Sequence, residues 1–298
     1  MLSILLPVYK CSCVALVTEL QRQCLECGIA YEIIVADDGT MADATNQYIV
    51  ERNKVIGQLE SVRYITRQEN VGRSAIRNFL FSQSKGDRIL FIDGDLSLDN
   101  PDFIRRYTQA EGDVVVGGIR IGGNPEQWKG NLRYKYECAF ERKHSLSDRQ
   151  RRPFQSFRTT NFIVKRAVFV QYPFDEKLTH YGYEDVLWGK TLEENGVQII
   201  HINNPITLTD YENNTLFIDK TEESLRTLYE YQMLLKGYSK LLEARDRVVL
   251  SHLLKVVLII NKLFGKKVKK LLQGNKPSIF LFNLYKLMYY ISLEQQAR

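Results

Sequence analysis

RILFIDGDL, residues 88–96, is a run of apolar, β-forming residues that ends in two aspartates separated by one glycine. In α/β proteins, functional side chains gather where the strands end. Two carboxylates this close repel each other unless a cation lies between them, and hard oxygen ligands suit Mg²⁺ or Mn²⁺. Asp93 and Asp95 are therefore a candidate site for a metal that carries a diphosphate. The plainer interpretation is that the two acids are solvated or cap the next helix.

Strand-like runs alternate with helical patterns along the first two thirds of the chain. The strands are expected at residues 3–8, 32–36, 62–66, 88–93, 113–119 and 197–202, and the helices at residues 14–27, 42–53, 73–84, 102–111 and 184–194. This alternation predicts an α/β fold with a mostly parallel sheet that is covered by helices on both faces. Residues 122–157 leave the pattern, and they either shape a substrate cleft or form a solvated helix and a charged loop.

The composition is that of a folded protein. Of 298 residues, 44% are hydrophobic and 26% are charged, which excludes a disordered chain. We find no apolar run long enough to span a membrane, and residues 1–8 do not have the form of a signal peptide. Five cysteines, clustered early, fit a reducing cytosol. Zinc is disfavoured because Cys24 and Cys27 fall in an apolar helical pattern.

The basic character of the chain, whose net charge is +6, belongs to its C-terminal part. From His252 onward, eight lysines face one acid, Glu294. Apolar residues lie on one face of a helical pattern and lysines on another, although Gly265 can break that helix. Such a helix either rests on an anionic membrane surface or packs its apolar face on the domain. The expected domains are residues 1–212 and a helical, basic extension at residues 213–298.

Acids also end the second strand, in Asp37-Asp38-Gly39. Neighbouring strands of a parallel sheet end at the same edge, so this pair is expected near Asp93 and Asp95. Carboxylates there can accept hydrogen bonds from a nucleobase or a ribose, although one of them can instead cap the next helix.

Two arginines open the third helix after a glycine, in Gly72-Arg73-Ser74-Ala75-Ile76-Arg77. Their spacing of four places both guanidinium groups on one face near the helix N-terminus, where phosphate oxygens bind well. In most helices such arginines are simply solvated. The segment Tyr183-Glu184-Asp185 opens another helix, where acids either complement the helix dipole or, at a cleft edge, take a proton from a hydroxyl.

Taken in order, these motifs resemble those of family 2 glycosyltransferases with the GT-A fold. The resemblance rests on Ser3-Ile4-Leu5-Leu6-Pro7-Val8-Tyr9, on Asp37-Asp38-Gly39, on residues 70–78, on Asp93-Gly94-Asp95, and on Tyr183-Glu184-Asp185 after Phe174-Asp175-Glu176. It spans residues 2–202 and does not reach the chain beyond Asn213.

The resemblance implies a nucleotide-sugar donor. Pro7, Tyr9 and Asp38 would contact its base and ribose, with Asp38 reading the base. Arg77, together with Arg73, would lie near the diphosphate. UDP is the expected nucleotide.

The resemblance also implies a metal and a general base. Asp93-Gly94-Asp95 matches the D-x-D motif, in which Asp95 most directly holds Mn²⁺ or Mg²⁺. Asp185 matches the general base, and Glu184 would orient the acceptor. The implied reaction is a single displacement with inversion onto a hydroxyl of a saccharide or a lipid-linked saccharide, in surface polysaccharide biosynthesis. We expect a cytoplasmic enzyme, peripheral at the inner face of the membrane, with no nucleic-acid partner.

One position departs from the family pattern. Many relatives carry a metal-binding histidine where this chain has Leu208, in Asn204-Pro205-Ile206-Thr207-Leu208. Either His201 or another group replaces it, water completes the metal shell, or the enzyme is weak. The alternative function is therefore a catalytically silent partner in a glycosyltransferase complex. A nucleotidyltransferase is disfavoured because residues 7–13 lack a glycine-rich phosphate loop.

Overall fold

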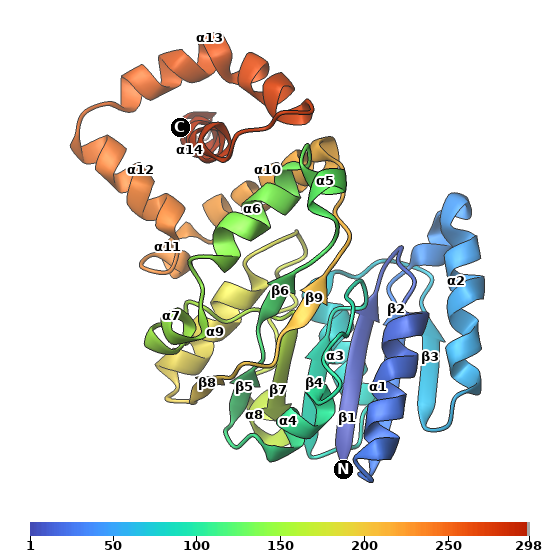
Figure 1. Ribbon diagram of the computed structural model, residues 1–298. Coiled ribbons are helices and arrows are strands. Elements are labelled where there is room, and N and C mark those ends of the chain that lie inside the picture. The colour runs from blue at the N-terminus through green and yellow to red at the C-terminus, as the bar shows by residue number, and fades with distance from the viewer. Residues whose placement is uncertain (297–298) are drawn as a thin grey trace. The chain divides into compact units, whose positions relative to one another are not determined.

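The computed structural model describes residues 1–296, and a seven-stranded sheet is the centre of this part of the chain (Figure 1). The strand order is β3-β2-β1-β4-β7-β5-β8, and only β7 runs antiparallel to its neighbours. The strands are β1 (Leu2–Val8), β2 (Tyr31–Asp37), β3 (Val62–Thr66), β4 (Arg88–Ile92), β5 (Val114–Val116), β7 (Asn161–Lys165) and β8 (Ile199–His201). The GT-A-type, mostly parallel α/β fold expected from the sequence is confirmed.

Strand register brings the chemically important strand ends together. Val8 of β1 pairs with Asp37 of β2, and Leu5 pairs with Phe91 of β4. The order of the strands reverses at β1, because β2 lies on one side of it and β4 on the other. Open α/β sheets bind their ligands in the crevice at such a reversal, beyond the carboxyl ends of the strands.

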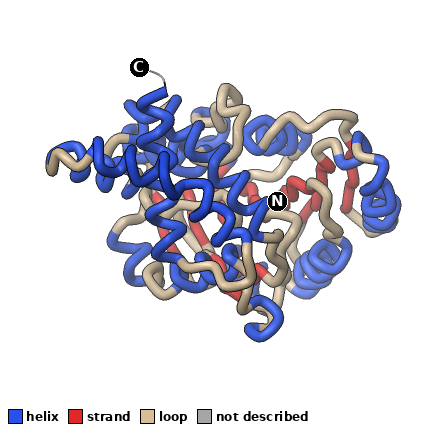
Figure 2. Tube along the Cα trace, turned by 90° about the horizontal axis from the view of Figure 1, so that it is seen from above, coloured by secondary structure: helices blue, strands red, loops and turns tan. Residues whose placement is uncertain are grey.

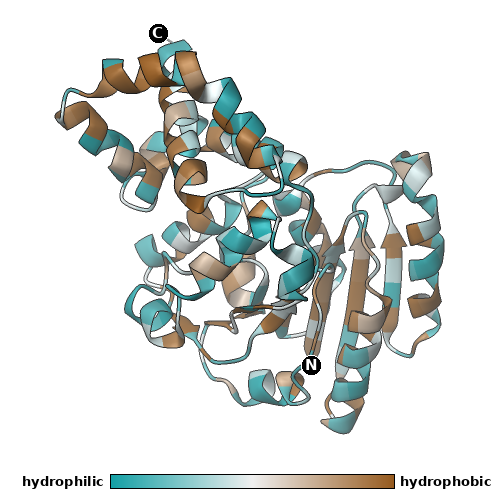
Figure 3. Ribbon diagram, turned by 45° about the horizontal axis from the view of Figure 1, so that its top comes forward, coloured by the Kyte–Doolittle hydropathy of each residue, from teal (hydrophilic) through white to brown (hydrophobic). Residues whose placement is uncertain are grey.

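Helices cover both faces of the sheet, which is seen from above in Figure 2. On one face lie α1 (Val14–Glu26) and α4 (Phe103–Gln109), which contact each other. On the other lie α3 (Arg73–Gln83), α8 (Arg166–Gln171) and the second half of α9 (Glu184–Glu194). The strands are hydrophobic along most of their length (Figure 3), as expected for a sheet buried on both sides.

Aromatic residues fill the core between the sheet and the second helix layer. The rings of Phe91 and Phe162 stack with their centroids 5.1 Å apart, and Trp188 of α9 lies 4.8 Å from Phe157. The Trp188 indole N–H donates to the Tyr172 carbonyl at 2.8 Å, so its one polar group is satisfied.

In the sheet and the helices around it, the structure differs from the sequence expectation in two places. The strand expected at residues 113–119 is divided into β5 and β6 (Ile119–Ile121), because Gly118 has a φ of +95° and turns the chain. β6 pairs with β9 (Ile206–Leu208) in a separate two-stranded sheet. The helix expected at residues 42–53 is regular only in α2 (Gln47–Asn53); short 3-10 turns at Thr40–Ala42 and Ala44–Asn46 precede it, and another, Lys54–Gln58, follows.

The chain folds into two compact units. Unit 1 comprises residues 1–122, 144–179 and 188–210, including the short helix α7 (Leu146–Arg151). Unit 2 comprises residues 123–143, 180–187 and 211–298. The expected domain boundary between residues 212 and 213 remains a prediction.

Unit 2 is helical, and α14 (Ile279–Gln296) lies at its centre (Figure 1). Because α14 is apolar on nearly all sides, it needs packing partners all round, and it contacts α6, α10, α12 and α13. The other helices of the unit are α5 (Pro125–Trp128), α6 (Leu132–Glu141), α10 (Asn214–Glu230), α11 (Gln232–Leu235), α12 (Lys240–Leu250) and α13 (Leu254–Gln273). Contrary to expectation, Gly265 does not break α13.

Within residues 1–296, no single helix has the length and apolar composition needed to cross a membrane. One bent pair, α12 with α13, passes that test only when the two helices are taken together, and they meet at an angle of 113°.

Candidate active site

The turn after β4 is pressed against the end of β1. Gly94 donates its N–H to the Pro7 carbonyl at 3.2 Å. A Cβ at Gly94 would lie 2.5 Å from Val8 Cγ2 and 3.1 Å from the Pro7 oxygen, so a larger residue would push the two strand ends apart. The absence of a side chain at Gly94 therefore allows the turn that carries Asp93 and Asp95 to lie against the end of β1.

Asp93 is neutralised from inside the protein. Arg77 Nη2 lies 2.5 Å from Asp93 Oδ1, and Arg77 Nη1 donates to the Arg73 carbonyl at 3.1 Å. The Arg77 side chain is 1% exposed, whereas that of Asp93 is 19% exposed. The Arg77 guanidinium also lies 5.9 Å from the centre of the Phe174 ring. Arg77 is therefore placed to hold Asp93 in position rather than to present its own charge to solvent.

Asp95 lies on the exposed side of the same turn. Its negative charge, second to burial, raises the pKa of Cys11, which places Asp95 near the loop that follows β1. Arg73 is also exposed, at the first residue of α3, where the helix N-terminus favours anions.

The carboxylates of Asp93 and Asp95 could hold a divalent metal. Among residues 1–296, no three His, Cys, Asp or Glu side chains cluster as a complete protein metal site. Mg²⁺ usually keeps several waters and binds through one or two carboxylates together with substrate phosphates. Two carboxylates on one turn, one of them exposed, fit that type of shared site.

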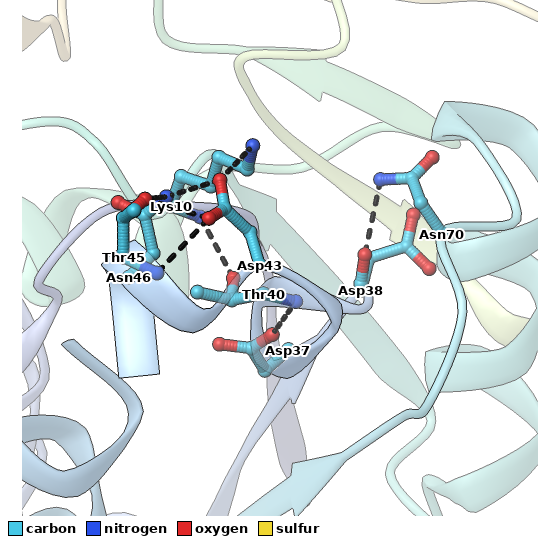
Figure 4. A network of polar contacts seen from close by, with 8 residues as sticks. All are labelled: Lys10, Asp37, Asp38, Thr40, Asp43, Thr45, Asn46 and Asn70. Carbon is cyan, nitrogen blue, oxygen red and sulfur yellow. Dashed lines mark hydrogen bonds and ion pairs between the residues drawn. The ribbon is translucent and has the colours of Figure 1, made fainter. Parts of the chain in front are cut away.

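The two acids at the end of β2 have different partners (Figure 4). Asp37 is buried; its Oδ1 accepts the Thr40 N–H at 2.8 Å and its Oδ2 accepts the Tyr64 hydroxyl at 3.0 Å. Asp37 thus organises the turn that follows the strand. Of the two acids, Asp38 is left to face the loop before α3.

The loop before α3 closes around Asp38. The two oxygens of its carboxylate accept the N–H groups of Val71, at 3.0 Å, and Gly72, at 3.2 Å. Asn70 Nδ2 donates to the Asp38 carbonyl at 3.0 Å (Figure 4). Burial raises the pKa of Asp38, while the two N–H donors oppose that effect. Because each carboxylate oxygen has two lone pairs, Asp38 can still accept a hydrogen bond from a ligand.

The side chains that hold the loop after β1 were not predicted from the sequence. Asn53 is buried; its Oδ1 accepts the Cys13 N–H at 3.1 Å and its Nδ2 donates to the Cys11 carbonyl at 3.0 Å. Thr40 Oγ1 accepts the Lys10 N–H at 2.8 Å, and Lys10 Nζ pairs with Asp43 at 2.9 Å (Figure 4). These contacts join residues at least 30 positions apart, so no local sequence pattern could have revealed them. They hold the loop that follows Tyr9, whose side chain is exposed.

His201 does not replace the histidine that many relatives carry at the position of Leu208. Its Nε2 donates to the Pro153 carbonyl at 2.9 Å, and its Nδ1 accepts from Arg149 at 3.0 Å. Burial lowers the pKa of His201 to about 4, so the ring is neutral at pH 7. With both nitrogens bound inside the fold, His201 has a structural role. Leu208 is itself buried in β9.

Glu184 and Asp185 begin α9 and belong to unit 2. Glu184 is buried, whereas Asp185 is half-buried and accepts the Val186 N–H at 2.8 Å. The turn before them has positive φ at Gly182 and Tyr183, and a Cβ at Gly182 would lie 2.7 Å from Ser224 Cβ. This turn therefore packs closely on α10.

The structure thus collects most of the expected residues at one place. Eight lie around the carboxyl edge of the sheet in unit 1: Pro7, Tyr9, Asp38, Arg73, Arg77, Asp93, Gly94 and Asp95. The other two, Glu184 and Asp185, lie at the start of α9 within unit 2. Their assignment to individual roles remains a prediction.

Residues 3–174, more than half of the chain, match the profile of glycosyl transferase family 2. The chain belongs to this family. Glycosyl transferase family 2 was the family expected from the sequence motifs, and the match covers all of them except Asp175-Glu176 and Tyr183-Glu184-Asp185.

Two similar proteins are undecaprenyl-phosphate 4-deoxy-4-formamido-L-arabinose transferases. The one from Pseudomonas aeruginosa (strain LESB58) is 31% identical over 135 residues, which cover 43% of this chain and 38% of that protein. The one from Aeromonas hydrophila subsp. hydrophila is 30% identical over 128 residues, which cover 40% of this chain and 37% of that protein. The chain therefore spans less than two fifths of the length of either relative.

A solved structure agrees with the fold. The mannosyltransferase PcManGT from Pyrobaculum calidifontis, solved with GDP-Man and Mn²⁺, has a TM-score of 0.54 to this chain at 11% identity. The superposition covers 99% of this chain and 86% of that one. At this identity the likeness extends to the fold alone.

Proposed function

We propose that this glycosyl transferase family 2 protein moves a sugar from a nucleotide-sugar donor, a UDP-sugar, to a hydroxyl of a saccharide or lipid-linked saccharide. One observation carries the proposal. Eight residues expected from the family motifs converge on the edge of the sheet where the strand order reverses, and they include an acid pair with one member neutralised and one exposed.

The donor's nucleoside would bind between the ends of β1 and β2. The Tyr9 ring is exposed there and offers a surface for the base, and the Asp38 carboxylate can accept an imide N–H, as uracil presents. The protein's own bonds to Asp38 fix its orientation before the donor arrives. Hydrogen-bond acceptors that are already oriented lose little freedom on binding.

The diphosphate would bind between Arg73 and Asp95. Arg73 contributes a cation at a helix N-terminus, and Arg77 keeps Asp93 in place through their ion pair. Mn²⁺ or Mg²⁺, when bound at Asp93 and Asp95, would supply positive charge to the departing nucleoside diphosphate. Asp95 would be the exposed carboxylate of that metal site, and Asp93 would be the carboxylate that the ion pair with Arg77 anchors in the fold.

Asp185 is proposed as the general base and Glu184 as the residue that orients the acceptor. Asp185 would take the proton from the acceptor hydroxyl as this attacks the anomeric carbon and the bond to the diphosphate breaks, which inverts the configuration. The half-buried position of Asp185 at a helix start suits a base that must stay ionised, because the N-terminal dipole favours its charge.

The acceptor is proposed to be lipid-linked, in the biosynthesis of a surface polysaccharide on the cytoplasmic side of a membrane. Two relatives are named as transferases to undecaprenyl phosphate, which supports an acceptor of this class. A second candidate function is a silent partner of a glycosyltransferase complex, because Leu208 cannot bind a metal and His201 does not substitute for a metal-binding histidine.

Substituting Asp185 tests the proposal. Asp185→Asn should slow sugar transfer by about 10²–10⁴, the usual contribution of general base catalysis, and should leave nucleotide binding unchanged. The assay measures release of UDP from a panel of UDP-sugars with saccharide and undecaprenyl-linked acceptors. Glu194→Gln, at an exposed position of the same helix, is the control and should keep full activity. Near-normal transfer by Asp185→Asn would reject this base, and no transfer by the wild type with any donor would favour the silent partner.

A further inference from the structure

The outer face of α13 is apolar although no part of the described chain covers it. Val256, Ile259, Ile260 and Leu263 follow the spacing i, i+3, i+4, i+7, which places them on one side of the helix. All four are exposed, Ile259 by 58% and Leu263 by 68%. Isolated exposed apolar residues are ordinary, but a contiguous row of them marks an interaction surface.

The preceding bend extends this surface. Leu250 at the end of α12 is 78% exposed, and Leu253 in the turn before α13 is also exposed. We call residues 250–264 with exposed apolar side chains the outer row; its members are Leu250, Leu253, Val256, Ile259, Ile260, Leu263 and Phe264. In this part of the chain, hydrophobic and hydrophilic residues alternate along the helices (Figure 3).

A different side of α13 holds unit 2 together. Val257 and Val268 pack into the cluster around Leu272, Phe282 and Tyr285, between α13 and α14. The sequence left open whether the apolar face of this helix packs on the protein or meets lipid. The structure separates two apolar faces, because the residues that pack inward are not those of the outer row.

Positive charge lines the outer row. Lys255, Lys262, Lys266, Lys267 and Lys270 are exposed on α13, and the sequence contains no acid between Asp246 and Glu294. Lys269 is the exception: it pairs with Glu222 at 2.7 Å and Asp219 at 3.2 Å on α10. Lys269 therefore serves the packing of unit 2 and is not one of the lysines of the outer surface.

We propose that the outer row and its lysines dock unit 2 on an anionic phospholipid bilayer, with α13 lying in the plane of the interface. An apolar face flanked by exposed lysines has the composition of helices that rest in the headgroup region. Each lysine close to an anionic leaflet adds attraction. The inward contacts of Val257 and Val268 hold α13 on the protein, so the helix lies on the membrane and does not cross it.

A second copy of the chain is the competing occupant of this face. In a symmetric dimer the same patch would meet itself. Five exposed lysines from each copy would then approach one another, with no acid between residues 247 and 293 to neutralise them. Like charges across an interface are unfavourable, whereas an anionic bilayer complements them.

Vesicle flotation tests this proposal without any assay of sugar transfer. The wild-type protein should float with vesicles of phosphatidylcholine and phosphatidylglycerol, and bind vesicles of phosphatidylcholine alone far more weakly. The double variant Ile259→Gln with Leu263→Gln should bind at least roughly tenfold more weakly, because two apolar side chains no longer enter the interface. The double variant Lys266→Gln with Lys267→Gln should bind these vesicles about 30-fold more weakly, because two lysines no longer attract the anionic lipid.

Two controls make the result specific. Val170→Gln removes an exposed apolar side chain of α8, in unit 1, and should float like the wild type. Lys269→Gln should lower the thermal stability of the protein and leave vesicle binding within about twofold, because its pairs are internal. Equal binding by the wild type and both double variants would overturn the proposal. So would a concentration-dependent dimer, measured by sedimentation, that Ile259→Gln with Leu263→Gln abolishes.

Discussion

The acids that end β2 and the acids that end β4 face the same edge of the sheet, but the protein neutralises them differently. Asp37 and Asp38 receive bonds from neutral donors, namely backbone N–H groups and the Tyr64 hydroxyl. Asp93 forms an ion pair with the buried guanidinium of Arg77, and Asp95 is exposed. The β2 end is therefore built to position acceptors for an uncharged group such as a nucleobase, and the β4 end to manage charge.

Removing the buried cation at the β4 end should lower the stability of the protein more than removing an acceptor at the β2 end. Arg77→Met leaves Asp93 without its buried partner, and we expect a loss of about 3–5 kcal/mol in the free energy of unfolding. Asp37→Asn keeps the shape of the side chain and one acceptor at the β2 end, and should cost about 1–2 kcal/mol. Urea unfolding at pH 7 measures both. Equal losses would mean that the two ends do not differ in the way described.

A third strand end, that of β8, sharpens the comparison through its pH dependence. His201 has a pKa of about 4 in the folded protein, below its ordinary value of 6.5, so protonation favours the unfolded chain. The neutral His201 makes its full contribution to the free energy of unfolding above pH 6.5. This contribution, up to roughly 3 kcal/mol, is lost as the pH falls from 6.5 through 4.

The measurement is the free energy of urea unfolding at pH 7 and at pH 4.5. His201→Gln should be less stable at pH 7 and should lose less on acidification than the wild type. His252→Gln, at an exposed position, is the control. If the wild type and His201→Gln lost stability in parallel, the neutral, internally bonded state of His201 would be refuted, and its exclusion as a metal ligand with it.

The glycines that follow β2 and β4, Gly39 and Gly94, should differ least in the loss of stability that their substitution causes. Gly39 has a φ of +86°, and a Cβ there would lie 2.5 Å from the Asn70 backbone nitrogen. At Gly94 the nearest atom, also at 2.5 Å, is the side-chain methyl Val8 Cγ2. Gly94→Ala should cost about 1–2 kcal/mol, and Gly39→Ala about 1–2 kcal/mol more, because its backbone conformation adds strain. Thermal unfolding ranks the two, and the reverse order would contradict this account of the two turns.

The sequence was sufficient to predict the sheet, most of its strands and the order of the motifs, because apolar strands and strand-end acids are local patterns. It identified Asp93 and Arg77 but could not show that they pair, since a helix and a strand must first pack together. Asn53 escaped notice because its partners lie about 40 residues away. The sequence also predicted an apolar face on α13 but could not divide it into an inner and an outer side, because only packing against α14 distinguishes Val257 from Val256.

The most direct test of the account is the thermal stability of the protein with UDP, GDP, CDP or dTDP, each with and without Mn²⁺. UDP with Mn²⁺ at about a hundred times the dissociation constant should stabilise the wild type by about 2.7 kcal/mol. Asp95→Asn should lose the part of this stabilisation that depends on the metal, and Asp99→Asn, at an exposed position four residues on, should retain it. A metal-dependent shift as large in Asp95→Asn as in the wild type, or no shift with any nucleotide, would contradict the proposed site.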